Sequence, residues 1–83
     1  MLNIKILGAG CPNCKRLEQE TKKAVDNLAI DAEVEKVTDY QKIMAYNVLS
    51  TPGLVINDKV VSTGKIPSQV ELISFLTSAL EEC

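Results

Sequence analysis

The change of hydrophobic period within the first 37 residues restricts the fold of this chain more than any other feature. "LNIKIL" at 2–7 alternates apolar and polar side chains, as a half-buried strand does. Gly8 and Gly10 interrupt this pattern, a helical spacing begins at Pro12, and 32–37 alternates again, weakly. A strand, a crossover helix and a second strand imply a parallel pair with a right-handed connection.

Two helices are predicted in the first 48 residues. The one that begins at Pro12 has an apolar face, formed by Leu17, Thr21, Ala24, Val25 and Leu28. Asp39 is placed to cap a short second helix, which carries Ile43, Met44 and Tyr46.

The last 31 residues predict a hairpin and a closing helix. "GLVIN" (53–57) and "KVVST" (59–63) are rich in β-branched residues and meet at Asn57-Asp58, which favours a tight turn. Pro67 precedes the closing helix, and Ser68 with Glu71 forms a capping box. We expect an apolar stripe on this helix, made of Val70, Ile73, Phe75, Leu76 and Leu80. The order is therefore β-α-β-α-β-β-α, an α/β fold in which helices pack on a mixed sheet.

Length and composition exclude several classes of function. The 83 residues form a single domain, 1–83, with no room for a second core. A net charge of −2, basic residues clustered only in pairs and the absence of Trp argue against a nucleic-acid partner. No apolar run approaches the ~20 residues of a membrane span. The segment before Cys11 is too short for a signal peptide of about 15–30 residues, and Lys5 interrupts it, so we expect a cytoplasmic protein.

The motif "CPNC" places Cys11 and Cys14 three positions apart, a spacing that allows three uses. A closed zinc site needs further ligands, but the chain has no His and its third cysteine is the terminal Cys83. A two-thiolate site for a soft ion such as Cu(I) survives this test. A structural disulfide would close a very short loop and stabilise the fold little, in a compartment that keeps thiols reduced.

A redox use of the two cysteines agrees best with their position. Pro12 suits the first helical turn, so Cys11 would lie where free N–H groups and the helix dipole stabilise a thiolate. Cys14 returns to the same face one turn later and can close a disulfide. This is the division between an attacking thiolate and a resolving thiol. Lys15 and Arg16 are expected on a solvated helix face, and Lys5 is expected as an outward strand charge.

Thr51-Pro52 supplies the second signal. It directly precedes the apolar strand at 53–57, where a proline withholds a ladder hydrogen bond. A cis peptide bond in a tight turn accommodates such a proline, although a trans proline that opens the strand is the commoner case.

Four features lie in a recognisable order along the chain: "CPNC" after the first strand, "YNVLSTPGLVIND" before the hairpin, Gly64 after the last strand and a closing helix. In these features the chain resembles small single-domain members of the thioredoxin/glutaredoxin superfamily. The resemblance implies a thioredoxin-like fold, with four strands in the order 4-3-1-2 flanked by helices. It also implies that Cys11 is the nucleophile and Cys14 the resolving thiol. Pro12, Thr51, Pro52 and Gly64 would lie against the substrate.

Two departures from this family's pattern stand near the cysteines. Gly10 occupies the position where thioredoxins usually carry Trp, and Lys5 stands where they often place a buried acid. The residues that glutaredoxins use to hold glutathione are not evident in "STGKIPSQ".

The sequence therefore predicts a small thiol–disulfide oxidoreductase that exchanges a Cys11–Cys14 dithiol with protein disulfides or a partner reductase. No cofactor, metal, nucleic acid or membrane is expected, and the protein is expected to be a monomer with Cys83 as an ordinary exposed thiol. The alternative is a soft-metal binding or delivery module that uses the same two thiolates. The reduction potential does not follow from the sequence, because the residues between the cysteines do not fix it alone.

Overall fold

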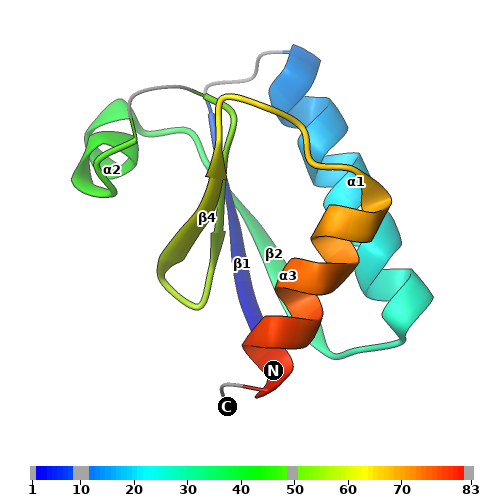
Figure 1. Ribbon diagram of the computed structural model, residues 1–83. Coiled ribbons are helices and arrows are strands. Elements are labelled where there is room, and N and C mark those ends of the chain that lie inside the picture. The colour runs from blue at the N-terminus through cyan, green and yellow to red at the C-terminus, as the bar shows by residue number, and fades with distance from the viewer. Residues whose placement is uncertain (1, 9–11, 49–50, 82–83) are drawn as a thin grey trace.

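The computed structural model describes residues 2–8, 12–48 and 51–81. Along the chain these residues form β1 (Leu2–Leu7), α1 (Pro12–Leu28), β2 (Ala32–Val37), α2 (Tyr40–Ala45), β3 (Gly53–Ile56), β4 (Lys59–Thr63) and α3 (Gln69–Glu81) (Figure 1). This is the predicted order of elements. Among the described helices, none is both long enough and apolar enough to cross a membrane.

The four strands form one mixed sheet in the order β2-β1-β3-β4. β1 runs parallel to β2, with Leu2 opposite Ala32, and antiparallel to β3, with Ile6 opposite Leu54. β3 and β4 form an antiparallel hairpin. Its two turn residues, Asn57 and Asp58, both have positive φ, as a type I′ turn requires. The predicted order 4-3-1-2 and the predicted hairpin are confirmed.

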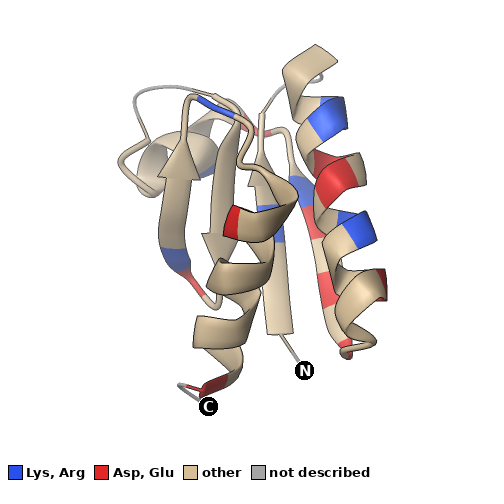
Figure 2. Cartoon of the chain, turned by 45° about the vertical axis from the view of Figure 1, so that its right-hand side comes forward, with Lys and Arg blue, Asp and Glu red and all other residues tan. Residues whose placement is uncertain are grey.

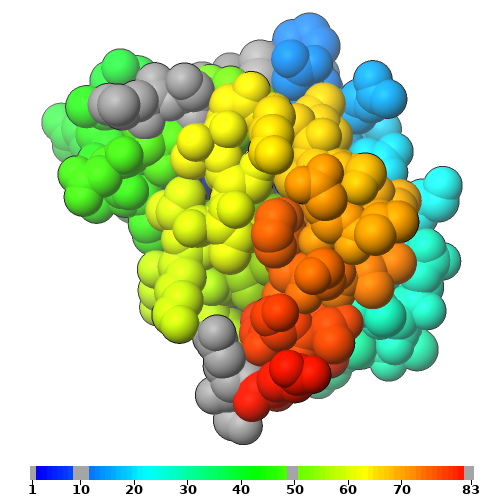
Figure 3. All heavy atoms as spheres, in the orientation of Figure 1, coloured from blue at the N-terminus to red at the C-terminus, as the bar shows by residue number. Residues whose placement is uncertain are grey.

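Each face of the sheet has its own core. α1 and α3 lie together on one side of the sheet and α2 lies on the other (Figure 1). The larger core, beneath α1 and α3, consists of the buried residues Leu2, Ile4, Ile6, Leu17, Ala24, Leu54, Ile56, Leu72, Leu76 and Ala79. The smaller core, beneath α2, consists of Leu7, Val37, Ile43, Val48 and Val55. Figure 3 shows α3 between the hairpin and α1.

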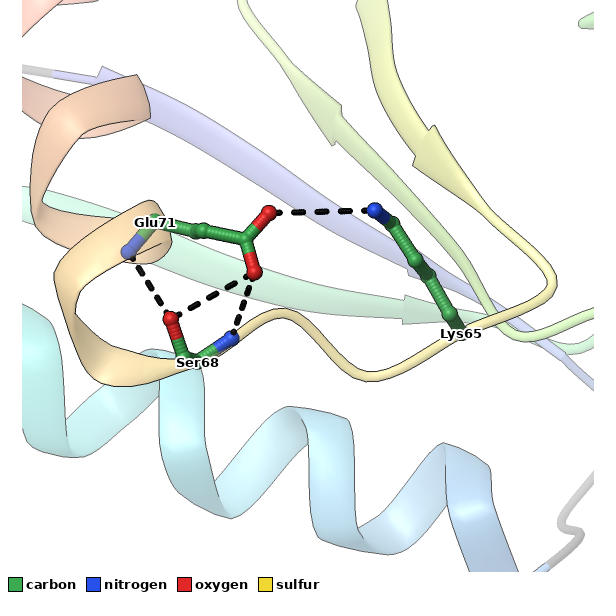
Figure 4. Close-up of polar contacts among 3 residues, drawn as sticks. All are labelled: Lys65, Ser68 and Glu71. Atoms are coloured by element: carbon green, nitrogen blue, oxygen red, sulfur yellow. Dashed lines mark hydrogen bonds and ion pairs between the residues drawn. The ribbon is translucent and has the colours of Figure 1, made fainter.

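Both predicted helix caps are present. The side chain of Asp39 accepts a hydrogen bond of 2.9 Å from the backbone N–H of Gln41 at the start of α2. Ahead of α3, the N–H of Glu71 donates to Oγ of Ser68, and the N–H of Ser68 donates to Oε1 of Glu71 (Figure 4). Lys65 forms an ion pair of 3.7 Å with the same carboxylate. The capping box thus fixes where the chain turns from β4 into α3.

Two details of the closing half differ from the sequence prediction. Val70 is 78% exposed and Leu80 is also exposed, whereas Leu72 and Ala79 are buried. Leu72, Leu76 and Ala79 follow the spacing i, i+4, i+7 and face the sheet, so Val70, two positions before Leu72, points away from it. The third strand ends at Ile56, one residue earlier than predicted, because Asn57 belongs to the turn.

Candidate functional site

Cys14 lies in the first turn of α1, and it is buried, with 5% of its surface exposed. It is disulfide-bonded in this structure. The other two cysteines, Cys11 and Cys83, fall outside the described residues, so the predicted pairing with Cys11 lies there too. Of the predicted redox pair, the structure therefore describes only the surroundings of Cys14, the predicted resolving cysteine.

Gly8 makes room for the sulfur of Cys14. It directly follows β1, and its N–H donates a hydrogen bond of 3.0 Å to the carbonyl of Val37. A β-carbon on Gly8 would overlap Sγ of Cys14, would lie 3.1 Å from its Cβ and would be 4.0 Å from Cβ of Thr51. The end of β1, the first turn of α1 and the segment before β3 thus meet at one point. The sequence predicted only a strand break at Gly8, so this role was missed.

The Thr51-Pro52 peptide bond is cis. Thr51 is exposed, and Pro52 and the following Gly53 are buried. The N–H of Gly64 donates a hydrogen bond of 2.9 Å to the carbonyl of Pro52, and Gly64 has a φ of 71°. Two predicted site residues are therefore joined directly. The proline for which the sequence left cis and trans open is cis.

The start of α1 favours negative charge at the site. Pro12 is the first residue of α1, as predicted, and it is exposed. The first turn carries no acidic residue, and the start of a helix is the positive end of its dipole. Lys15 and Arg16 are exposed, which agrees with a solvated helix face. Figure 2 shows this basic segment near the start of α1, with acidic residues further along the helix.

Lys5 is less exposed than the outward strand charge that the sequence predicted. Its side chain is only 28% exposed, and Nζ donates a hydrogen bond of 3.0 Å to the hydroxyl of Tyr46. Nζ also lies 3.7 Å from Oδ1 of Asp58. The hydrogen bond to Tyr46 is the main reason why the pKa of the Lys5 ammonium is raised. Lys5 thus joins β1 to the residue that ends α2, a contact between distant segments that strand alternation does not reveal.

A hollow of about 260 Å³ borders the site on the side of α2. It is lined by Tyr40, Ile43, Met44, Val48 and Thr51. Thr51 belongs both to this hollow and to the cluster with Gly8 and Cys14. Within the described ranges, no group of three or more Cys, His, Asp or Glu side chains is arranged to hold a metal ion.

These features define a class of protein. They are typical of a thioredoxin-like oxidoreductase: a mixed sheet in this strand order, a disulfide-bonded cysteine in the first turn of the helix after β1, and a cis-proline before β3. The fold itself is matched by a solved thioredoxin-2, described as a component of the malaria parasite protein secretion machinery. The TM-score is 0.71 at 15% identity, over 94% of this chain and 82% of that one.

Comparison of sequences identifies the family. The model of the family described as thioredoxin domain matches residues 2–77, and the chain belongs to that family. A thioredoxin of Methanocaldococcus jannaschii is 47% identical over 98% of this chain and 93% of its own length. A thioredoxin of Methanothermobacter thermautotrophicus is 35% identical over 93% of this chain and all of its own.

The activity that follows is that of a thiol–disulfide oxidoreductase. Proteins of this kind act on protein disulfides and are themselves reduced by a reductase. Nothing in the comparisons supports the alternative of a soft-metal binding module.

Proposed function

We propose that Cys11 and Cys14 are the redox pair, with Cys11 as the nucleophile and Cys14 as the resolving thiol. The observation that carries the proposal is the disulfide-bonded state of Cys14 in the first turn of α1. Cys14 is buried, which suits a thiol that reacts only with a neighbour already held in place. Cys11 directly precedes α1 in the sequence, and the positive end of a helix dipole favours a thiolate there.

The exchange proceeds in two balanced steps. The thiolate of Cys11 attacks one sulfur of the substrate disulfide, forms a mixed disulfide and releases the other substrate sulfur as a thiolate. The thiolate of Cys14 then attacks the sulfur of Cys11 and releases the second substrate thiol. The substrate gains two electrons and two protons, and the protein is left with the Cys11–Cys14 disulfide. A dithiol reductase returns those electrons by the same exchange in reverse.

Pro12, Thr51, Pro52 and Gly64 form the surface against which the substrate chain lies. Thr51 is exposed directly before β3, so its backbone is open to an extended segment that pairs beside it. Pro52 has no N–H that could be left unpaired beside the substrate chain, and its carbonyl accepts a hydrogen bond from the N–H of Gly64. Pro12 is exposed at the start of α1. We further propose that the protein acts as a monomer in the cytoplasm, without a bound cofactor.

Single cysteine variants test these roles. Turnover is measured with insulin as the disulfide substrate and dithiothreitol as the reductant. The covalent adduct is sought by mixing the pre-reduced variant with insulin after the dithiothreitol has been removed, because dithiothreitol would itself cleave a mixed disulfide. We expect Cys14→Ser to accumulate a covalent adduct with insulin, because the mixed disulfide is no longer resolved. Cys11→Ser should neither reduce insulin nor form the adduct. Cys83→Ser is the matched control and should keep full turnover. Full turnover by Cys11→Ser would show that the roles are wrong.

A further inference from the structure

We propose that the hollow between α2 and the strands β1 and β2 binds a small hydroxylated organic anion. Lys5, Lys42 and Tyr46 hold the oxyanion group of this ligand, and the carboxylate of Glu35 accepts a hydrogen bond from one of its hydroxyl groups. The hollow measures about 360 Å³ and is lined by Lys5, Glu35, Val37, Lys42, Ala45 and Tyr46. It shares no lining residue with the cluster around Cys14, so this inference does not rest on the proposed redox function.

The polar side chains of the hollow come from three elements. Lys5 and Glu35 lie opposite each other in the parallel pair of β1 and β2. Lys42 and Tyr46, the residue that ends α2, are four positions apart and so lie on one face of that helix. α2 covers this side of the sheet, whereas α1 and α3 lie on the other (Figure 1). The fold thus gathers these four side chains around one hollow.

Lys5 and Tyr46 present hydrogen-bond donors that the described part of the protein does not use. The ammonium of Lys5 has three N–H groups, and one of them donates a hydrogen bond of 3.0 Å to the hydroxyl of Tyr46. The 3.7 Å between Lys5 and Asp58 is an ion-pair distance, longer than a hydrogen bond. Because the Tyr46 oxygen accepts from Lys5, its own proton is left for a further acceptor. An oxyanion supplies acceptors for both groups.

The charges of the hollow are not paired with one another. Among the described residues, Lys42 forms no ion pair, and none joins Glu35 to either lysine. The pKa of Lys5 is raised, chiefly by its hydrogen bond to Tyr46, so its ammonium stays charged at neutral pH. Two ammonium groups outweigh one carboxylate, so the hollow attracts an anion. The carboxylate then favours an anion that also carries hydroxyl groups.

Part of the site is ordered before a ligand binds. Lys5 is only 28% exposed, and its Nζ lies 5.8 Å from the centre of the Tyr46 ring. That ring packs in turn against the smaller core. Side chains that are already ordered lose less entropy on binding. The volume lies in the range of small-molecule sites, about 300–1,000 Å³, and Val37 and Ala45 offer apolar contacts to a carbon chain.

Four probes separate the two ends of the ligand. Ribose 5-phosphate and gluconate carry hydroxyl groups together with a phosphate or a carboxylate, whereas inorganic phosphate is the anion alone and ribose has the hydroxyl groups alone. Each probe is titrated into isotope-labelled protein at constant ionic strength, and dissociation constants are fitted to the amide shifts of Glu35, Lys42 and Tyr46 in two-dimensional NMR. We expect ribose 5-phosphate or gluconate to bind at least about fivefold more tightly than inorganic phosphate and ribose. The tighter of the two identifies the oxyanion.

Variants assign the contacts. Lys42→Gln and Tyr46→Phe should each weaken binding of the tighter probe by about fivefold, because each removes one contact to the oxyanion, and Lys42→Arg should keep the wild-type affinity. Lys22→Gln is the matched control, since it removes an exposed lysine of α1 and should leave the affinity unchanged. Glu35→Gln should reduce the preference for the hydroxylated probe over inorganic phosphate, because the hydroxyl group loses a charged acceptor.

Three results would each overturn the inference. The first is the absence of saturable shifts with all four probes up to about 10 mM. The second is inorganic phosphate that binds as tightly as both hydroxylated probes, which would show attraction of charge alone. The third is an equal loss of affinity in Lys42→Gln and Lys22→Gln. The proposed redox function is decided separately, by the insulin turnover of Cys11→Ser.

Discussion

Replacing Gly8 by alanine tests whether this position is kept small for the sulfur of Cys14. The new β-carbon would overlap Sγ of Cys14 and lie 3.1 Å from its Cβ. Among the described glycines, positive φ occurs at Gly64 and not at Gly8, so alanine fits the backbone and the cost is steric. Overpacking of this kind costs about 1–3 kcal/mol. Alanine also restricts the unfolded chain, which offsets about 0.4–1 kcal/mol.

The net loss, from about 0 to about 2.6 kcal/mol, should depend on the redox state. A free thiol can rotate its sulfur away from the new methyl group, whereas a bonded sulfur is held by its partner. We expect Gly8→Ala to destabilise the oxidised protein by about 1 kcal/mol more than the reduced one. Since about 30 mV corresponds to 1.4 kcal/mol, the two-electron midpoint should rise by roughly 20 mV. Urea unfolding of both forms and titration in dithiothreitol buffers measure the two quantities independently.

Gly53→Ala is the matched control. A β-carbon there would lie 3.3 Å from Cβ and Cδ1 of Leu7, a tight contact that involves no sulfur. Its cost should therefore be the same in the oxidised and the reduced protein, with an unchanged midpoint. The argument is refuted if Gly8→Ala costs the same in both forms and leaves the midpoint where it was.

Three further predictions concern the frame of the fold. Ser68→Ala should cost about 1 kcal/mol of stability and lower Tm by about 4–8 °C in calorimetry. Ser74→Ala, in the exposed middle of α3, is the control and should leave Tm unchanged. Equal shifts in the two variants would show that Ser68 does not cap α3. Leu76→Ala should cost about 2–5 kcal/mol in urea unfolding, and a loss below 1 kcal/mol would show that this site is not packed as described. Tyr46→Phe should lower the pKa of Lys5, followed by NMR, because the hydrogen bond that raises it is gone. The raised pKa of Lys5 favours the folded state at neutral pH, and this contribution is lost as the pH rises above 10.5. If the pKa of Lys5 were the same in Tyr46→Phe as in wild type, the hydrogen bond would not be its cause.

The order of elements could be predicted because each signal is local. The alternation at 2–7, the turn at Asn57-Asp58 and the capping box at Ser68 depend on neighbours in the chain, and all three are present. The parallel pairing of β1 with β2 follows from the length of the connection between them. A right-handed crossover then leaves few topologies to consider.

The prediction was wrong where a residue's surroundings come from a distant segment. Val70 fits a helical apolar pattern, yet the sheet meets the face of α3 that carries Leu72. Lys5 fits an outward position on a strand, yet Tyr46 at the end of α2 covers it. The hollow beside Thr51 depends on the placement of α2 over the sheet, which no spacing in the sequence encodes.

A redox titration of the Cys83→Ser protein tests the central claim most directly. The protein is equilibrated across dithiothreitol buffers and alkylated, and the disulfide between Cys11 and Cys14 is identified by peptide mass spectrometry. We predict a single two-electron transition with a midpoint within about −200 to −270 mV, the range of thioredoxins and glutaredoxins. Failure to form that disulfide in any oxidising buffer would contradict the assignment of Cys11 and Cys14 as the redox pair.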